Sequence, residues 1–262
     1  FYAAGPGRFL AERARLDPAG LASLARWNDL YAHLWWGATR VGGYLFPIAV
    51  WPLLFRGDRR RDLGLRLGGL RRHLWIYALC VAVMVPLLLL VRRQPDFGAY
   101  YPIYRGAGRS WLDFLSWEAV YLAQFFALEA FFRGWWLGAT RDLGAASIFA
   151  MVVPYTMIHF GKPWLEVSGA IVAGVVLGSL AVRTRSVYAG FLVHATVGLL
   201  MDVLALERRG ALPELLVPGG TERFVFGGWA LVLFLVWAGA LAVLLVEAVR
   251  HRRARAGPAR EA

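Results

Sequence analysis

Long apolar blocks alternate with short polar segments along the chain. The seven blocks lie at about residues 30–55, 74–91, 117–139, 145–160, 165–182, 187–206 and 224–249. Most are close to the length of about 20 residues that an α-helix needs to cross about 30 Å of hydrocarbon. The pattern therefore predicts an all-α protein, a polytopic bundle of about seven transmembrane helices. Pro47 and Pro52 predict a kink or a break in the first helix.

The polar segments divide the chain into three parts. Residues 1–28 are too polar to span a membrane, and we expect an interfacial helix or a flexible lead-in there. Residues 29–249 form the predicted transmembrane domain, with a catalytic core at 117–202. Residues 250–262 form a basic tail. We expect no cleavable signal peptide, because the first apolar block lies too far from the start and is too long.

Composition and charge support a membrane protein. Hydrophobic residues make up 59% of the 262 residues, against about 45–50% in soluble domains. The net charge is +12, but most basic residues lie between the apolar blocks, which favours anionic lipid over nucleic acid as their partner. The single cysteine, Cys80, excludes an intrachain disulfide and a cysteine-cluster metal site.

The distribution of basic residues predicts the orientation and the source. With seven spans, 15 Lys and Arg residues flank the side that carries the C-terminus and 12 flank the other side. The positive-inside rule then places the C-terminus in the cytoplasm. All basic residues except Lys162 are arginine, which is typical of a GC-rich bacterial genome. We therefore expect an integral protein of the bacterial inner membrane.

The ionisable residues Glu129, Arg133, His159 and His194 lie inside three of the apolar blocks. A charged group in hydrocarbon costs at least about 2.5 kcal/mol on insertion scales, so each needs a partner or a function. Glu129 and Arg133 share one helix face, where they form either a structural ion pair or a general base held by an arginine.

The two histidines extend this polar group. His159 precedes a Gly161-Lys-Pro163 break, and His194 lies well inside its block. At about 1.5 Å per residue, Glu129 and His194 both lie about 18 Å from the outer ends of their helices, so they can meet. A lone membrane histidine usually makes only a structural hydrogen bond, but these residues together can activate a water against a peptide carbonyl.

The motif order resembles the CPBP family, which contains the CAAX proteases and bacteriocin-processing (ABI) enzymes. The resemblance rests on Glu129-x-x-x-Arg133-Gly134, Tyr155-x-x-x-His159 and the later His194. It implies an all-helical intramembrane fold and an endopeptidase that cuts near the membrane-proximal C-terminal end of its substrate.

The chain departs from the family pattern at two positions. The family usually has two adjacent glutamates, and Leu128 stands at the first of them. The family usually has Asn or Asp four residues after the last histidine, and Gly198 stands there, with Asp202 as the nearest acid. Further residues that could support the site are Tyr155, Lys162, Glu166 and Asp202.

A metal site is the next alternative. His159, His194 and Glu129 would make a zinc set of two histidines and one carboxylate. No HExxH pair fixes two ligands on one helix, and a metal-free glutamate mechanism is also argued for the family. We therefore assign no cofactor.

These observations favour an intramembrane protease that acts on a membrane-anchored protein or peptide. The alternative is a non-catalytic relative, a membrane scaffold or bacteriocin-immunity protein, and Leu128 is its best support. A transporter or channel would show an inverted repeat between halves, and we find none. A membrane phosphatase or acyltransferase would need a His-Asp or Arg-rich pattern that is also missing.

Overall fold

The computed structural model describes residues 25–55, 63–65 and 70–212, with two short pieces at 10–11 and 14–15. In this part of the chain every regular element is a helix, as the apolar blocks predict. The expected seventh span at 224–249, the basic tail and most of the N-terminal segment lie outside the described residues.

The helices follow the predicted blocks with shifted ends. The elements in chain order are α3 (Ala25–Leu54), α4 (Leu70–Val91), α5 (Pro95–Tyr100), η2 (Arg105–Arg109), α6 (Trp111–Glu129), η3 (Ala130–Trp136), α7 (Leu137–Ala139), η4 (Arg141–Leu143), α8 (Ala146–Met157), α9 (Trp164–Thr184) and α10 (Tyr188–Arg208). The connection between the second and third blocks, predicted as polar loop, contains the short helices α5 and η2.

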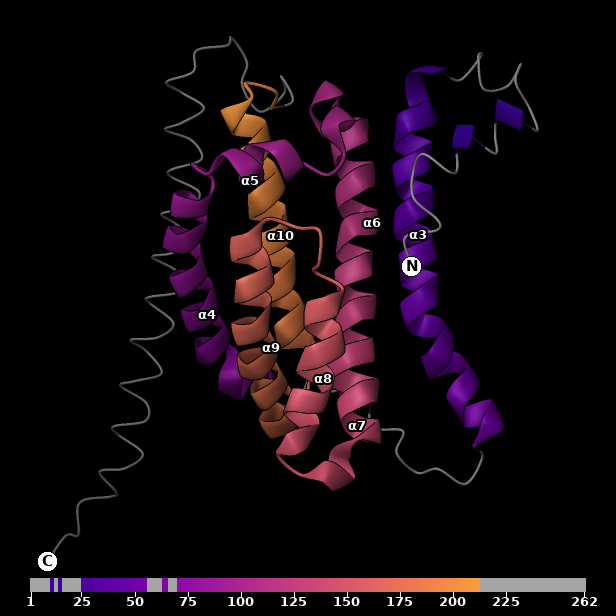
Figure 1. Ribbon diagram of the computed structural model, residues 1–262, viewed down its shortest axis with the longest axis vertical. Helices are drawn as coiled ribbons and strands as arrows, with labels where there is room; N and C mark the ends of the chain where they lie inside the picture. Colours follow the sequence, from indigo (N-terminus) through magenta and orange to yellow (C-terminus); the bar gives the residue numbers. More distant parts are fainter. Residues whose placement is uncertain (1–9, 12–13, 16–24, 56–62, 66–69, 213–262) are drawn as a thin grey trace, which may run out of the picture.

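The long helices run side by side, with α10 among them (Figure 1). α10 contacts α4, α6 and α9, while α3 packs on α6 and α8 packs on α9. In Figure 1, α3 and α4 lie on opposite flanks. α3 is helical through Pro47 and Pro52, and its C-terminal part changes direction (Figure 1). The two prolines therefore bend α3 without breaking it.

Within the described part of the chain, three helices are long and apolar enough to cross a membrane, judged by length and composition. They are residues His73–Val91 of α4, then α9 and α10. α8 is apolar but has only 12 residues, about 18 Å at the usual helical rise. α8 is thus shorter than the predicted span at 145–160, because the helix ends at Met157 and a turn follows.

α9 lies close to α8 because it presents glycine where the two helices meet. A Cβ at Gly174 would stand 3.0 Å from a methyl of Val152, and one at Gly178 would stand 2.8 Å from the terminal methyl of Met151. Small residues four apart permit such close approach between membrane helices. The Gly174–Gly178 pattern therefore serves packing, which places Tyr155 of α8 inside the bundle.

α6 begins at a polar cap and ends in an unusual turn. Ser110 caps its start, since the Ser110 hydroxyl accepts a hydrogen bond from the Asp113 amide at 3.1 Å. After Glu129 the chain passes into the π-helix η3 and returns to α-helical geometry at Leu137. π-helical turns are rare and often mark functional sites.

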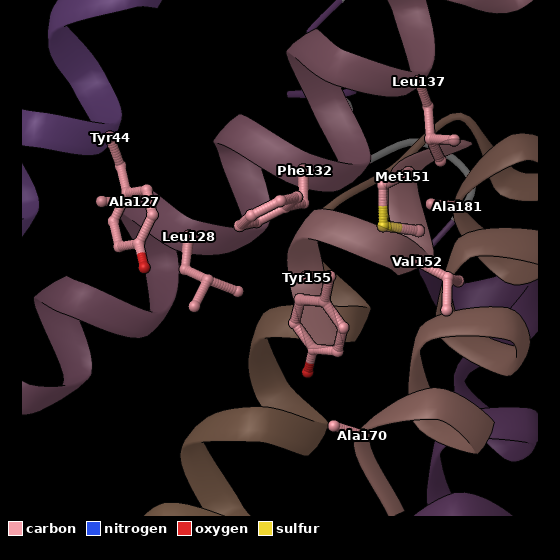
Figure 2. Close-up of a cluster of buried hydrophobic side chains, with 10 residues drawn as sticks. All are labelled: Tyr44, Ala127, Leu128, Phe132, Leu137, Met151, Val152, Tyr155, Ala170 and Ala181. Atoms are coloured by element: carbon pink, nitrogen blue, oxygen red, sulfur yellow. The ribbon is translucent and has the colours of Figure 1, made fainter. Parts of the chain in front are cut away.

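An apolar cluster surrounds this turn and joins four helices (Figure 2). Its buried members are Tyr44, Ala127, Leu128, Phe132, Leu137, Met151, Val152, Tyr155, Ala170 and Ala181. Because these side chains come from α3, the α6–α7 segment, α8 and α9, the cluster fixes the position of the π-helical turn within the bundle.

Candidate active site

The site is centred on Glu129, the last residue of α6. Its side chain is fully buried, and Glu129 Oε1 lies 3.1 Å from Arg133 Nη1 on the next turn. The Arg133 side chain is also fully buried, and its guanidinium carbon lies 3.9 Å from the centre of the Tyr155 ring. Each charge is thus compensated inside the bundle, by the opposite charge and, for Arg133, also by an aromatic face.

His194 of α10 contacts the same carboxylate. His194 Nδ1 lies 2.8 Å from Glu129 Oε1. An ionised carboxylate only accepts hydrogen bonds, so Nδ1 donates to it, and in a neutral imidazole Nε2 would then keep its lone pair. His194 Nε2 faces the hydroxyl of Tyr155 at 3.4 Å, a long and weak contact.

The side chains of Glu129 and His194 differ in their exposure to solvent. The Glu129 side chain has no exposed surface, whereas 16% of the His194 side chain is exposed. Gly190, one turn before His194, closes the space around the carboxylate, because a Cβ there would stand 2.6 Å from Glu129 Oε2. Water can therefore reach the imidazole more readily than the carboxylate.

His159 lies two residues beyond the end of α8, in the turn that precedes Gly161. It is buried, and its Nδ1 lies 2.8 Å from the backbone oxygen of Tyr155. Its ring centre is 4.8 Å from that of Tyr155, and the His194 ring is 6.3 Å from the same ring. Tyr155 thus contacts both histidines.

The central residues fall within one family match. Residues 110–200 match the family model described as Rce1-like, type II CAAX prenyl endopeptidase Rce1-like. This segment is similar to the Rce1-like family. The family is one of CAAX proteases, as the motif order predicts, and its members are helical membrane endopeptidases. The comparisons with curated proteins and with solved structures gave no match.

The Rce1-like segment contains all four residues that the sequence predicts as catalytic. The structure brings Glu129, Arg133 and His194 into direct contact, with His159 joined to them through Tyr155. Leu128, where the chain departs from the family pattern, has apolar surroundings in the structure. Leu128 is buried in the apolar cluster of Figure 2, with Tyr44, Phe132 and Tyr155 as fellow members.

Lys162 and Glu166 form a separate polar group near His159. Lys162 Nζ lies 2.6 Å from Glu166 Oε1, and the Tyr101 hydroxyl donates to Glu166 Oε2 at 2.5 Å. Burial raises the pKa of the Tyr101 hydroxyl well above its ordinary value, which keeps it a donor. The segment before α6 is thereby attached to the start of α9, beside the Rce1-like motifs.

Asp202 lies two turns beyond His194 and has another partner. Trp117 Nε1 donates to Asp202 Oδ2 at 2.7 Å, and both side chains are fully buried. Glu118 is buried beside Trp117, and neither of its carboxylate oxygens has a hydrogen-bond partner among the described residues. Asp202 therefore braces α6 against α10 and does not touch either histidine.

The zinc alternative finds no support in the donor set. Among the described residues, no three His, Cys, Asp or Glu side chains converge as a metal ion would require. The Oε1 atom of Glu129 is already shared by Arg133 and His194. We therefore build no step of the chemistry on a metal.

Two features of the site were not singled out by the sequence pattern. Gly190 matters because it admits the carboxylate, and Phe125 because it covers the face of the His194 ring. The sequence spacing could have indicated Gly190, because Gly190, His194 and Gly198 recur every four residues on one face of α10.

Proposed function

We propose that the chain is an intramembrane endopeptidase that cleaves a membrane-anchored protein or peptide near its anchor, at the C-terminal side of the substrate. We place it in a bacterial inner membrane with its C-terminus in the cytoplasm. The observation that carries the proposal is the 2.8 Å contact between His194 Nδ1 and the buried, Arg133-paired carboxylate of Glu129.

In the proposed mechanism His194 is the base and Glu129 supports it. His194 Nε2 takes a proton from water while the resulting hydroxide attacks the scissile carbonyl carbon. The fixed carboxylate of Glu129 stabilises the imidazolium that forms. The imidazolium then returns its proton to the leaving amine as the carbon–nitrogen bond breaks. This assigns to His194 the role that the sequence suggested for Glu129, because His194 is the more accessible of the two.

In this mechanism the Tyr155 hydroxyl serves the carbonyl oxygen, and His159 holds Tyr155 in position through the hydrogen bond from its Nδ1 to the Tyr155 backbone oxygen. The Tyr155 hydroxyl lies at the Nε2 side of His194, and His159 packs against the same tyrosine. A hydrogen-bond donor at a developing oxyanion contributes about 10²–10³ in rate in known hydrolases. Arg133 orients the carboxylate and does not contact the substrate in this mechanism.

Loss of His159 is the first test. Cells would express the chain with a library of epitope-tagged, membrane-anchored proteins, and C-terminal mass spectrometry would identify shortened products. We expect wild-type protein to yield a product and His159→Ala to reduce its rate at least about 100-fold. His33→Ala is the matched control, since this partly buried α3 histidine contacts Asp29, outside the site. Equal products from both variants at equal protein levels would refute the proposal.

A non-catalytic scaffold or immunity protein is the second candidate, and the apolar surroundings of Leu128 favour it. Leu128→Glu would restore the usual first glutamate of the family and separates the two functions. If Glu129 and His194 already suffice, the new carboxyl only costs stability, about 1–3 kcal/mol for a buried polar group without a partner.

We therefore expect Leu128→Glu to lower the melting temperature and not to raise cleavage. The control is Leu128→Gln, which introduces similar size and polarity without an acid. Cleavage that appears only in Leu128→Glu would mean that the natural chain is inactive and acts as a scaffold.

A further inference from the structure

The His194 ring is held on its face as well as at its edge. Phe125 lies on α6 one turn before Glu129, and its ring stacks on the imidazole with 4.8 Å between centres and 15° between planes. Phe125 is itself buried, and Tyr121 packs on it with 4.5 Å between ring centres. The imidazole thus has a buried aromatic surface beneath it.

A glycine on α10 makes room for this surface. A Cβ at Gly198 would stand 2.4 Å from Phe125 Cε2 and 2.7 Å from Phe125 Cζ, closer than real Cβ contacts come. Any other residue at 198 would displace the phenyl ring. Gly198 follows His194 by one helical turn, so the ring that occupies its space also reaches the imidazole.

The same fit of a side chain of α6 against a glycine of α10 occurs twice, once on each side of His194. Gly190 and Gly198 lie one turn on either side of His194, and they admit Glu129 and Phe125, which are themselves one turn apart on α6. The carboxylate holds Nδ1, while the phenyl ring limits the tilt of the imidazole plane. Together they aim Nε2 toward the Tyr155 hydroxyl, which lies too far away at 3.4 Å to hold the ring alone.

We propose that Phe125 is a positioning residue for His194, and that Gly198 is required because it admits the Phe125 ring. Gly198 is the position at which the family usually carries Asn or Asp. In this chain an aromatic stack orients the histidine there without a polar side chain. The catalytic consequence rests on the proposed function, whereas the orientation of the ring can be measured separately.

The test uses Phe125→Leu, which keeps an apolar side chain but removes the stacked ring. We expect kcat to fall about 10- to 100-fold with KM unchanged, because misplacement by about 1 Å costs that much in a catalytic group. Magnetic resonance of histidine-labelled protein in lipid nanodiscs would show the His194 ring protons losing the upfield shift that a stacked phenyl imposes.

The matched control is Phe126→Leu at the next position of α6. The Phe126 ring packs on Tyr188 and Phe191, so its loss should leave both kcat and the His194 resonances unchanged. An unchanged His194 resonance in Phe125→Leu would overturn the proposal. If the resonance changes in Phe125→Leu and the wild-type protein itself cleaves nothing, the positioning role stands and the proposed protease activity is refuted.

A second variant pair tests the contact with Gly198. Gly198→Ala should lower the melting temperature in the wild-type background, because its methyl meets the phenyl ring. In the Phe125→Leu background the same change should have little effect, since the clashing atoms are gone. Equal losses in both backgrounds would show that Gly198 is needed for another reason and would overturn the pairing.

Discussion

Glu129→Ala is expected to abolish cleavage and to destabilise the protein by about 3–5 kcal/mol, the usual cost of removing one partner of a buried ion pair. Both side chains of the Glu129–Arg133 pair are fully buried. Without the carboxylate, the Arg133 guanidinium would keep, among the described residues, the Tyr155 ring as its compensating contact. Thermal unfolding in lipid nanodiscs, followed by tryptophan fluorescence, would measure the loss.

For Glu129→Ala, loss of stability has to be distinguished from loss of catalytic chemistry. An inactive Glu129→Ala protein could have lost its fold and not its chemistry. The double variant Glu129→Leu/Arg133→Met removes both charges, so it should recover most of the stability while cleavage stays absent. If Glu129→Ala alone were as stable as the double variant, the ion pair would not be the structural unit that we describe.

A control pair lies elsewhere in the bundle. Arg92 Nη1 and Glu207 Oε2 are 2.7 Å apart, but both side chains keep nearly a fifth of their surface exposed. Glu207→Ala should therefore cost about 1 kcal/mol or less, because partly solvated ion pairs contribute little. The difference between the two alanine variants measures the effect of full burial.

Gly190→Ala is expected to reduce cleavage at least about 100-fold through a single added methyl group. Its Cβ would stand 2.6 Å from Glu129 Oε2, so the carboxylate must move away from His194 Nδ1 or α10 must move away from α6. Overpacking of this kind also costs about 1–3 kcal/mol in stability. Product formation and melting temperature, measured on the same preparation, would record both effects.

Gly169→Ala is the control for helix glycines in general. No atom lies within 4 Å of a Cβ at Gly169 on α9. Alanine there should leave cleavage unchanged and raise stability by up to about 1 kcal/mol through its higher helix propensity. If Gly190→Ala cleaved as well as Gly169→Ala, the close fit of the carboxylate against α10 would be irrelevant to function.

The sequence predicted contacts that depend on spacing along one helix or on depth in the membrane. The Glu129–Arg133 pair follows from a separation of four residues, and the meeting of Glu129 with His194 follows from equal depth. His159 was correctly expected beside the Gly/Pro break.

Contacts that depend on the rotation of one helix against another could not be predicted in this way. Asp202 contacts Trp117 on α6 and not His194, which lies two turns earlier on α10. The stack of Phe125 on His194 depends on the same relative rotation of α6 and α10. The π-helical turn after Glu129 depends on the packing around it, and no single residue in the sequence predicts it.

The order in which the site residues occur along the chain has a consequence for biosynthesis. Glu129 and Arg133 lie on consecutive turns, so a nascent α6–η3 segment can enter the bilayer as a neutralised unit before later helices are made. The imidazole of His194 arrives only with α10, 65 residues after the carboxylate. The newly synthesised protein therefore lacks the contact between His194 and Glu129 until α10 is inserted.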